Sequence, residues 1–347
     1  MTKRFGSGLG PGLVLVFCLS QAFRDVYFGH VFQDVDFFAV ILIAFLLSTV
    51  IFTVIALLRA PHTVRKLRGH LRIVLVINVT TAIAWSCYFF ALTSVEPSIV
   101  NTLHSGMGPL TVVALAALGV RSANLETIGW CEYFGFAGMA LSLVGLWWVV
   151  ASNSSSLPST EPSGGLCGVA LLLVSGSSIT ISLLYCKRLH DHGVSADVIT
   201  AVRYIALILI AGGGVMHSGG LGGIATLDQA VTLSILATVL IVLPLYALQV
   251  GIALTAPLTA NVLRSLGPVF VFALQQVDGR LAYSTPTLIC VLVYSAAAIA
   301  ANVAHGLRHG HSGEPSDSGK ARDRRIGAPD VSFGRLPRLR LGVDPSG

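Results

Sequence analysis

The stretch Pro257–Pro268 reads PLTANVLRSLGP and places one arginine, Arg264, inside an otherwise apolar or small-residue segment. An earlier stretch, Pro97–Pro109, reads PSIVNTLHSGMGP and repeats its prolines, asparagine, serine and glycine-proline pair. The two align without a gap from the first proline to the serine, and one inserted residue then brings the glycine-proline pairs together. His104 falls opposite Arg264 in this alignment. This similarity between the two stretches indicates that the two halves of the chain are repeats of one another.

Composition predicts that both stretches lie in a membrane. Hydrophobic residues make up 54% of the 347 residues and charged residues only 11%, whereas soluble domains carry about 25% charged residues. The mean hydropathy is +0.79. A hydrocarbon core of ~30 Å needs ~20 apolar residues per helix. Apolar runs between polar breaks give ten candidate spans, at 11–31, 37–58, 72–92, 97–119, 127–150, 165–186, 197–217, 230–252, 257–277 and 284–306.

Five helices per repeat is an odd number, so the second repeat must cross the membrane in the opposite direction to the first. We therefore predict an all-α membrane protein with ten transmembrane helices in two inverted five-helix repeats, a plan used by many secondary transporters. The predicted division is a cytoplasmic N-terminus at 1–10, a first repeat at 11–150, an external Ser/Pro/Gly-rich linker at 151–165, a second repeat at 166–306 and a basic, disordered cytoplasmic tail at 307–347.

The distribution of lysine and arginine predicts the orientation. Basic residues follow the second, fourth and sixth candidate spans and fill the tail, while the linker at 151–165 has none. Cytoplasmic segments carry the excess of Lys and Arg. We expect a multi-pass protein of the cell membrane, in a bacterium the inner membrane, with both termini in the cytoplasm.

The depth of the two aligned residues singles them out. His104 and Arg264 are each the eighth residue of their span, which places them roughly 11–12 Å from opposite membrane faces. An arginine at that depth costs about 2.5–3.5 kcal/mol, so it should face a cavity or a partner. A guanidinium offers planar, bidentate donors to phosphate or carboxylate. The predicted substrate-binding residues, which share one helical stripe in each span, are Arg264, His104, Asn261, Asn101, Ser265 and Ser105.

Four further polar residues are candidates for the transport pathway. Gln275 falls near the stripe of Arg264. Arg24 and Asp25 are neighbours on the first span and point about 100° apart on a helix, so pairing between them is not required. Arg203 lies near the cytoplasmic end of the seventh span, where snorkelling to the interface is the alternative explanation.

Three passages carry a resemblance to a known family. They are ALTSVEPSIVNTLHSGMGP at Ala91–Pro109, ALTAPLTANVLRSLGPV at Ala253–Val269 and LETIGWCEYFGFAGMALSLVGLWWV at Leu125–Val149. The chain resembles the drug/metabolite transporter superfamily, which includes EamA-type permeases and the triose-phosphate and nucleotide-sugar transporters. It departs from the EamA-type Gly-Glu pair, since Val120 follows Gly119. The resemblance implies that basic residues in helices four and nine help to hold an anion, a role that would fall to His104 and Arg264.

We therefore expect a secondary transporter that moves a small polar metabolite, anionic through phosphate or carboxylate, by alternating access. The alternative is an EamA-type exporter of neutral amino acids or drug-like compounds, in which Arg264 is structural. A membrane-embedded enzyme acting on lipid phosphates is disfavoured, because Glu96, Glu126 and Glu132 are too dispersed to form a site. No catalytic residue, metal, cofactor or nucleic-acid partner is expected. The expected partners are the small-molecule substrate and the bilayer, and the oligomeric state stays open.

Overall fold

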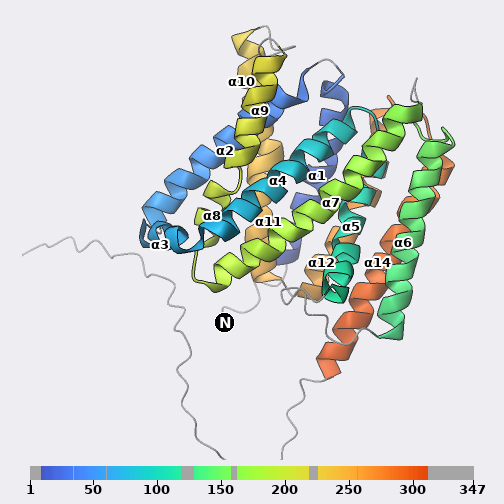
Figure 1. The fold of residues 1–347 in the computed structure, drawn as a ribbon. Coiled ribbons are helices and arrows are strands. Elements are labelled where there is room, and N and C mark those ends of the chain that lie inside the picture. Colours follow the sequence, from blue (N-terminus) through green and yellow to red (C-terminus); the bar gives the residue numbers. More distant parts are fainter. Residues whose placement is uncertain are drawn as a thin grey trace, which may run out of the picture.

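The computed structural model describes residues 9–33, 35–59, 61–118, 129–157, 162–218, 226–255 and 257–311. Every regular element in these ranges is helical, and the long helices run alongside one another as a bundle (Figure 1). Nine helical stretches in the described ranges are long and apolar enough to cross a membrane. The chain therefore has the architecture of a multi-pass helical membrane protein.

The first half of the bundle consists of five continuous long helices. They are α1 (Leu9–Val31), α2 (Phe37–Arg59), α4 (Leu71–Leu92), α5 (Pro97–Ala117) and α6 (Trp130–Ala151). A short helix, α3 (Pro61–Lys66), and a 3₁₀ turn (Leu67–His70) connect α2 to α4. Each long helix overlaps one predicted span, so the first five spans are confirmed as helices.

Three of the five crossings in the second half are interrupted. The continuous ones are α7 (Pro162–Asp191) and α14 (Thr285–His311). The interrupted ones are α8 (Ala196–Val202) with α9 (Ile205–His217), α10 (Leu227–Ala237) with α11 (Leu243–Leu254) across a π-helical turn at Thr238–Val242, and α12 (Pro257–Ser265) with α13 (Gly267–Asp278). Together they cover the predicted seventh, eighth and ninth spans.

Each interruption has a local physical cause. Pro268 has no N–H and cannot bond the carbonyl of Arg264, so α12 ends there. Pro244 follows the π-helical turn and likewise removes a donor from that stretch. Between α8 and α9 the side chain of Asn78, from α4, replaces the missing bonds. Its Nδ2 donates to the Val202 carbonyl at 2.9 Å and its Oδ1 accepts from the Ala206 N–H at 3.1 Å.

Two predicted boundaries are wrong. α7 begins at Pro162, so the end of the predicted linker at 151–165 is helical. α14 continues to His311, so the start of the predicted tail at 307–347 is helical as well. The remaining tail, 312–347, and the first part of the predicted N-terminal segment, 1–8, lie outside the described residues.

The helices pack in a definite set of pairs. The most extensive contacts join α4 to α7, α6 to α14 and α1 to α11, followed by α5 to α7, α1 to α12 and α13, α2 to α8 and α9, and α5 to α13. Some pairs approach closely because a glycine lies between them. A Cβ added at Gly176 of α7 would lie 2.5 Å from the His104 carbonyl oxygen of α5. The α5–α7 contact is therefore tight against the backbone of a candidate site residue.

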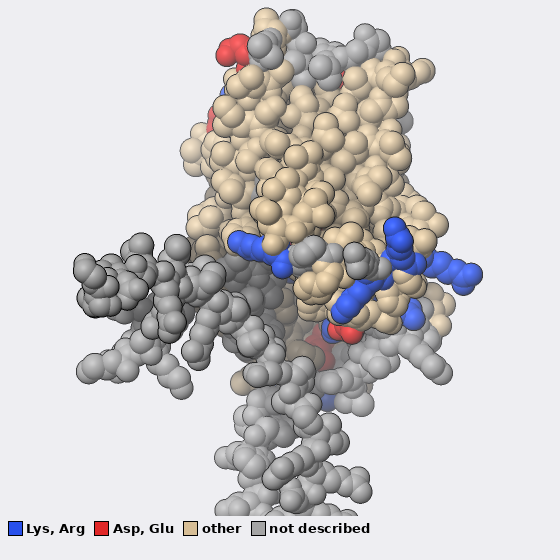
Figure 2. Space-filling view, turned by 90° about the vertical axis from the view of Figure 1, so that its left-hand side faces the viewer, with Lys and Arg blue, Asp and Glu red and all other residues tan. Residues whose placement is uncertain are grey.

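Lysine and arginine gather at one end of the molecule. Figure 2 shows them at one level below a broad surface without charged side chains. The exposed basic residues belong to the ends of α2 and α7, to the connection between α2 and α4, and to the start of α4: Arg59, Lys66, Arg68, Arg72, Lys187 and Arg188. We call this the basic end. It is the end that the sequence analysis predicts to be cytoplasmic.

Candidate functional site

A buried ion pair lies on α1. The side chains of Arg24 and Asp25 are 6% and 0% exposed. Arg24 donates from Nε and Nη2 to Asp25 Oδ1, at 2.9 and 2.6 Å. The sequence did not require these neighbours to pair, and in the structure they do. Their Cβ atoms do point in different directions, but the long arginine side chain folds back to reach the adjacent carboxylate.

Helices α4 and α5 complete the surroundings of this pair. Asn101 donates from Nδ2 to Asp25 Oδ2 at 2.8 Å, and Arg24 Nη2 donates to the Tyr88 hydroxyl at 3.3 Å. The guanidinium also lies over the rings of Trp85 and Tyr88, 5.3 and 5.4 Å from their centroids. Both carboxylate oxygens thus accept hydrogen bonds, which a buried pair needs in order to offset its desolvation. Tyr88 and Trp85 were not predicted as site residues.

His104 lies next to this network. Its ring contacts the Tyr88 ring edge to face, with centroids 4.7 Å apart. Its Nδ1 is 2.9 Å from Ser175 Oγ, and Ser175 donates its own proton to the Ala84 carbonyl at 2.6 Å. Because that proton is committed, Nδ1 of His104 is the donor to Ser175. The neutral imidazole therefore keeps Nε2 as a free acceptor position, which becomes a donor if the ring is protonated.

Arg264 differs from Arg24 in having no hydrogen-bond or ion-pair partner among the described residues. It lies at the end of α12, one residue before the break, and its side chain is exposed. The helix that carries it packs against α1 and α14.

The residues that we call the central cluster are Arg24, Asp25, Tyr88, Asn101 and His104. The break between α12 and α13 lies beside it, since a Cβ added at Gly267 would lie 3.7 Å from Asn101 Oδ1. Charges interact more strongly in a low-dielectric interior than in water. Arg24 has its carboxylate partner in Asp25, whereas the donors of Arg264 have no partner among the described residues and match an oxyanion.

The other predicted residues have separate surroundings. Ser265 is buried, donates to the Asn261 carbonyl at 2.9 Å and lies 3.5 Å from Asn302 Nδ2. The Asn261 side chain is exposed on the same face as Arg264. Ser105 is half-buried. The side chains of Asn261 and Ser105 have no hydrogen bond within the described ranges, so only Asn101 and His104 join the network around Arg24 and Asp25.

Gln275 and Arg203 lie away from the central cluster. Gln275 is buried near the far end of α13, where Nε2 donates to the Glu96 carboxylate at 2.8 Å. The predicted stripe shared with Arg264 is interrupted by the α12–α13 break. Arg203 lies between α8 and α9 with its guanidinium over the Tyr204 ring, 5.2 Å from the centroid, and its Nε is buried without a partner in the described part of the chain.

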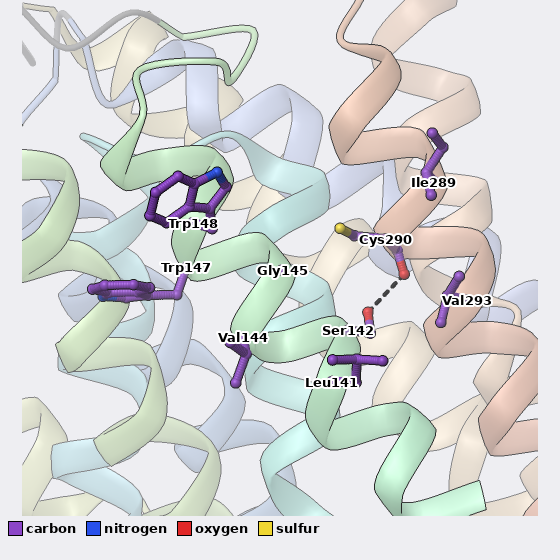
Figure 3. Close-up of a pocket in the computed structure, with 9 residues that line it drawn as sticks. All are labelled: Leu141, Ser142, Val144, Gly145, Trp147, Trp148, Ile289, Cys290 and Val293. Atoms are coloured by element: carbon purple, nitrogen blue, oxygen red, sulfur yellow. Dashed lines mark hydrogen bonds between the residues drawn. The ribbon is translucent and has the colours of Figure 1, made fainter.

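A groove of about 400 Å³ opens elsewhere, on the outside of the α6–α14 pair (Figure 3). Its lining is almost wholly apolar and includes Trp147, Trp148 and Val293, and the hydroxyl of Ser142 is bonded to the Cys290 carbonyl at 2.7 Å. A lining this apolar, on the outside of the helix pair, does not suit a polar metabolite.

Comparison with known proteins bears on the fold alone. No protein-family model and no curated protein matches the chain. Six solved chains match it. One of them, titled "Crystal structure of protein", has a TM-score of 0.57 at 15% sequence identity, and the match covers 88% of this chain and 99% of that one. A likeness at this identity shows that the arrangement of helices occurs in a solved protein, and it carries no function.

Proposed function

We propose that the protein is a secondary transporter for a small anionic metabolite that bears phosphate or carboxylate. The observation that carries this proposal is Arg264, an exposed arginine at the end of α12 that has no hydrogen-bond or ion-pair partner among the described residues, on a helix that packs against α1 and α14. An ionisable residue inside a membrane is expensive to keep unless it acts on a substrate or ion. A planar guanidinium with free donors matches an oxyanion.

The interrupted crossing adds to this. Transporters commonly form their midplane sites at discontinuous helices, where freed backbone groups and half-helix ends meet the substrate. Arg264 ends α12, and α13 begins two residues after Ser265, at Gly267. Asn101 of the ion-pair network is close by, since a Cβ added at Gly267 would lie 3.7 Å from Asn101 Oδ1. The break thus faces the polar network of α5.

The packing of the helices supports the inverted repeat that alternating access would use. If the two halves are repeats, each of the first five crossings has a counterpart among the last five. The counterpart of α1 is α7, and that of α4 is α11. The α4–α7 contact then becomes the α11–α1 contact, and the α5–α7 contact becomes that of α1 with α12 and α13. The pairs α2–α9, α5–α13 and α6–α14 map onto themselves. A pseudo-two-fold relation between the halves accounts for this pattern.

The proposed setting is the cell membrane, with the basic end in the cytoplasm as the positive-inside rule requires. In this orientation α12 enters from the cytoplasmic side and α5 from the outside. Arg264 and His104 then approach the same midplane region from opposite faces, since each is the eighth residue of its helix.

The test is ligand-dependent thermal stability of the purified protein. Sugar phosphates, small dicarboxylates and neutral amino acids would be added to wild type, Arg264→Gln and Arg264→Lys. The matched control is Arg280→Gln, which removes an exposed arginine that follows α13, at the end of the molecule opposite the basic end. We expect anions to stabilise wild type and Arg280→Gln, Arg264→Lys to respond weakly, and Arg264→Gln to lose the response. Equal stabilisation of all four proteins by neutral compounds would refute the anion proposal and favour the neutral exporter.

A further inference from the structure

Glu96 is a buried carboxylate that the central cluster does not use. It immediately precedes α5, at the end of the molecule opposite the basic end, and it is 0% exposed. Oε1 accepts from Ser98 Oγ at 2.6 Å and from Gln275 Nε2 at 2.8 Å. Oε2 accepts from the Ser156 N–H at 2.9 Å and from Thr287 Oγ1 at 3.3 Å. Four donors therefore converge on one side chain.

These donors are not those of an ordinary helix cap. An N-cap side chain accepts from the N–H groups of its own first turn, and the Glu96 side chain makes no such bond. Its partners instead come from α13, from the start of α14 and from the segment that follows α6. The hydrogen bonds to Glu96 therefore join parts of the chain that are distant in sequence.

Secondary bonds widen this junction. Gln275 Oε1 accepts from the Ser98 N–H at 3.4 Å, so α5 and α13 are joined twice. Thr287 Oγ1 shares its one proton between Glu96 Oε2 at 3.3 Å and Ser284 Oγ at 2.9 Å, and Ser284 donates its own proton to the Ser154 carbonyl at 2.9 Å. The junction therefore includes segments from both halves of the chain, all held through one carboxyl group.

The four donors are all neutral, and no described cation bonds the Glu96 carboxyl group. The charged pair nearest along α13, Asp278 and Arg280, has side chains 29% and 52% exposed. A buried polar group is costly unless hydrogen bonds replace its hydration. Glu96 therefore depends on these bonds, and their loss should release several segments at once.

We propose that Glu96 is the latch that holds the end opposite the basic end closed in the transport cycle. The latch rests on the proposed function, because alternating access requires the two halves to separate at each end in turn. In the structure α5 and the segment after α6 are fastened to α13 and α14 through Glu96. Opening this end towards the central cluster requires these bonds to break.

The other glutamate that is buried in the described ranges serves as the control. Glu132, at the start of α6, lies at the basic end, where Oε1 is 3.4 Å from His305 Nδ1 and 3.6 Å from Arg308 Nη1. All three residues belong to the α6–α14 pair. Replacing Glu132 by glutamine makes the same substitution at a buried position without touching the latch.

The experiment measures the width of the latched end directly. Spin labels would be placed at two exposed positions, Gln33→Cys and Ala282→Cys. Gln33 lies beside the turn between α4 and α5, since its side chain donates to the Thr93 carbonyl, and Ala282 lies just before α14. The exposed native cysteines, Cys131 and Cys167, would be replaced by serine. Electron–electron distance distributions would then be recorded in lipid nanodiscs without substrate, in the wild-type background and with Glu96→Gln or Glu132→Gln.

We expect Glu96→Gln to add a longer-distance population and to raise the open-to-closed ratio by about tenfold or more, because glutamine replaces one acceptor oxygen by an amide that faces donors. Glu132→Gln should leave the distribution unchanged. A folded Glu96→Gln protein with the wild-type distribution would overturn the latch. If Glu96→Gln does not fold, Gln275→Met and Thr287→Val each remove one donor and should shift the distribution in the same direction. Unchanged distances in both would be equally decisive against it.

This result is separate from the anion proposal. The distances are recorded without ligand, so a protein that binds no anion can still show the latch. Conversely, anion stabilisation that depends on Arg264, together with distances that do not respond to Glu96, would retain the transporter and remove the latch.

Discussion

Replacing Asp25 by asparagine should destabilise the protein while changing its shape very little. Asparagine keeps an oxygen that can accept from Arg24 but loses both the negative charge that compensates a buried cation and the acceptor of the Asn101 bond. Breaking a buried pair in this way costs about 3–5 kcal/mol. The rings of Trp85 and Tyr88 continue to stabilise the guanidinium, by roughly 1 kcal/mol. We therefore expect a loss near the lower limit, about 3 kcal/mol of unfolding free energy.

The measurement is reversible unfolding by SDS in lipid–detergent micelles, followed by tryptophan fluorescence. Arg24→Met and Arg24→Met/Asp25→Asn complete a double-mutant cycle, and the double variant should be less destabilised than the sum of the single variants by at least about 2 kcal/mol. Asp278→Asn is the control, since its pair with Arg280 is partly exposed at 3.6 Å and should be worth under about 1 kcal/mol. Additive single effects, or an Asp25→Asn loss no larger than the control, would show that the buried pair is not coupled as described.

Two further predictions concern helix geometry. Asn78→Leu removes both side-chain bonds at the α8–α9 break, so it should lower the free energy of unfolding by about 2–3 kcal/mol and speed amide exchange there. Unchanged exchange would mean that the break does not depend on Asn78. Gly176→Val places a Cβ 2.5 Å from the His104 carbonyl oxygen, whereas Gly212 has no atom within 4 Å of its added Cβ. We expect only Gly176→Val to lower stability in the same SDS assay, by about 1–3 kcal/mol, and an equal loss in Gly212→Val would contradict a tight α5–α7 contact.

The crossings could be predicted because length and hydropathy determine them, but their ends and interruptions could not. The sixth span was predicted to end at 186, yet α7 continues to Asp191, since Lys187 and Arg188 can reach water from a helix end. Pro268 marks the α12–α13 break in the sequence. The α8–α9 break has no such marker, because it depends on Asn78 of another helix.

The site was predictable where one residue is conspicuous by itself. An arginine inside an apolar span stands out, so Arg264 and Arg24 were found, as was Asn101 through its alignment. Tyr88 and Trp85 lie in a run of aromatic residues that looks like ordinary core. Glu96 was set aside as dispersed, because its partners Gln275 and Thr287 are 179 and 191 residues away along the chain. Only the fold brings them together.

The aligned residues of the two halves have become unequal in a way that fits a binding site. Asn101 is buried and bonded to Asp25, whereas its counterpart Asn261 is exposed. His104 is held by Ser175, whereas its counterpart Arg264 has no partner in the described chain. The first half thus supplies bonded polar groups, and the second supplies an arginine without a partner in the described chain, at an interrupted helix. In the transporter that we propose, two copies of the bonded set would have no donor to offer an anion, and two such arginines would repel each other. One of each would keep the bundle stable and leave one guanidinium for the proposed anionic substrate.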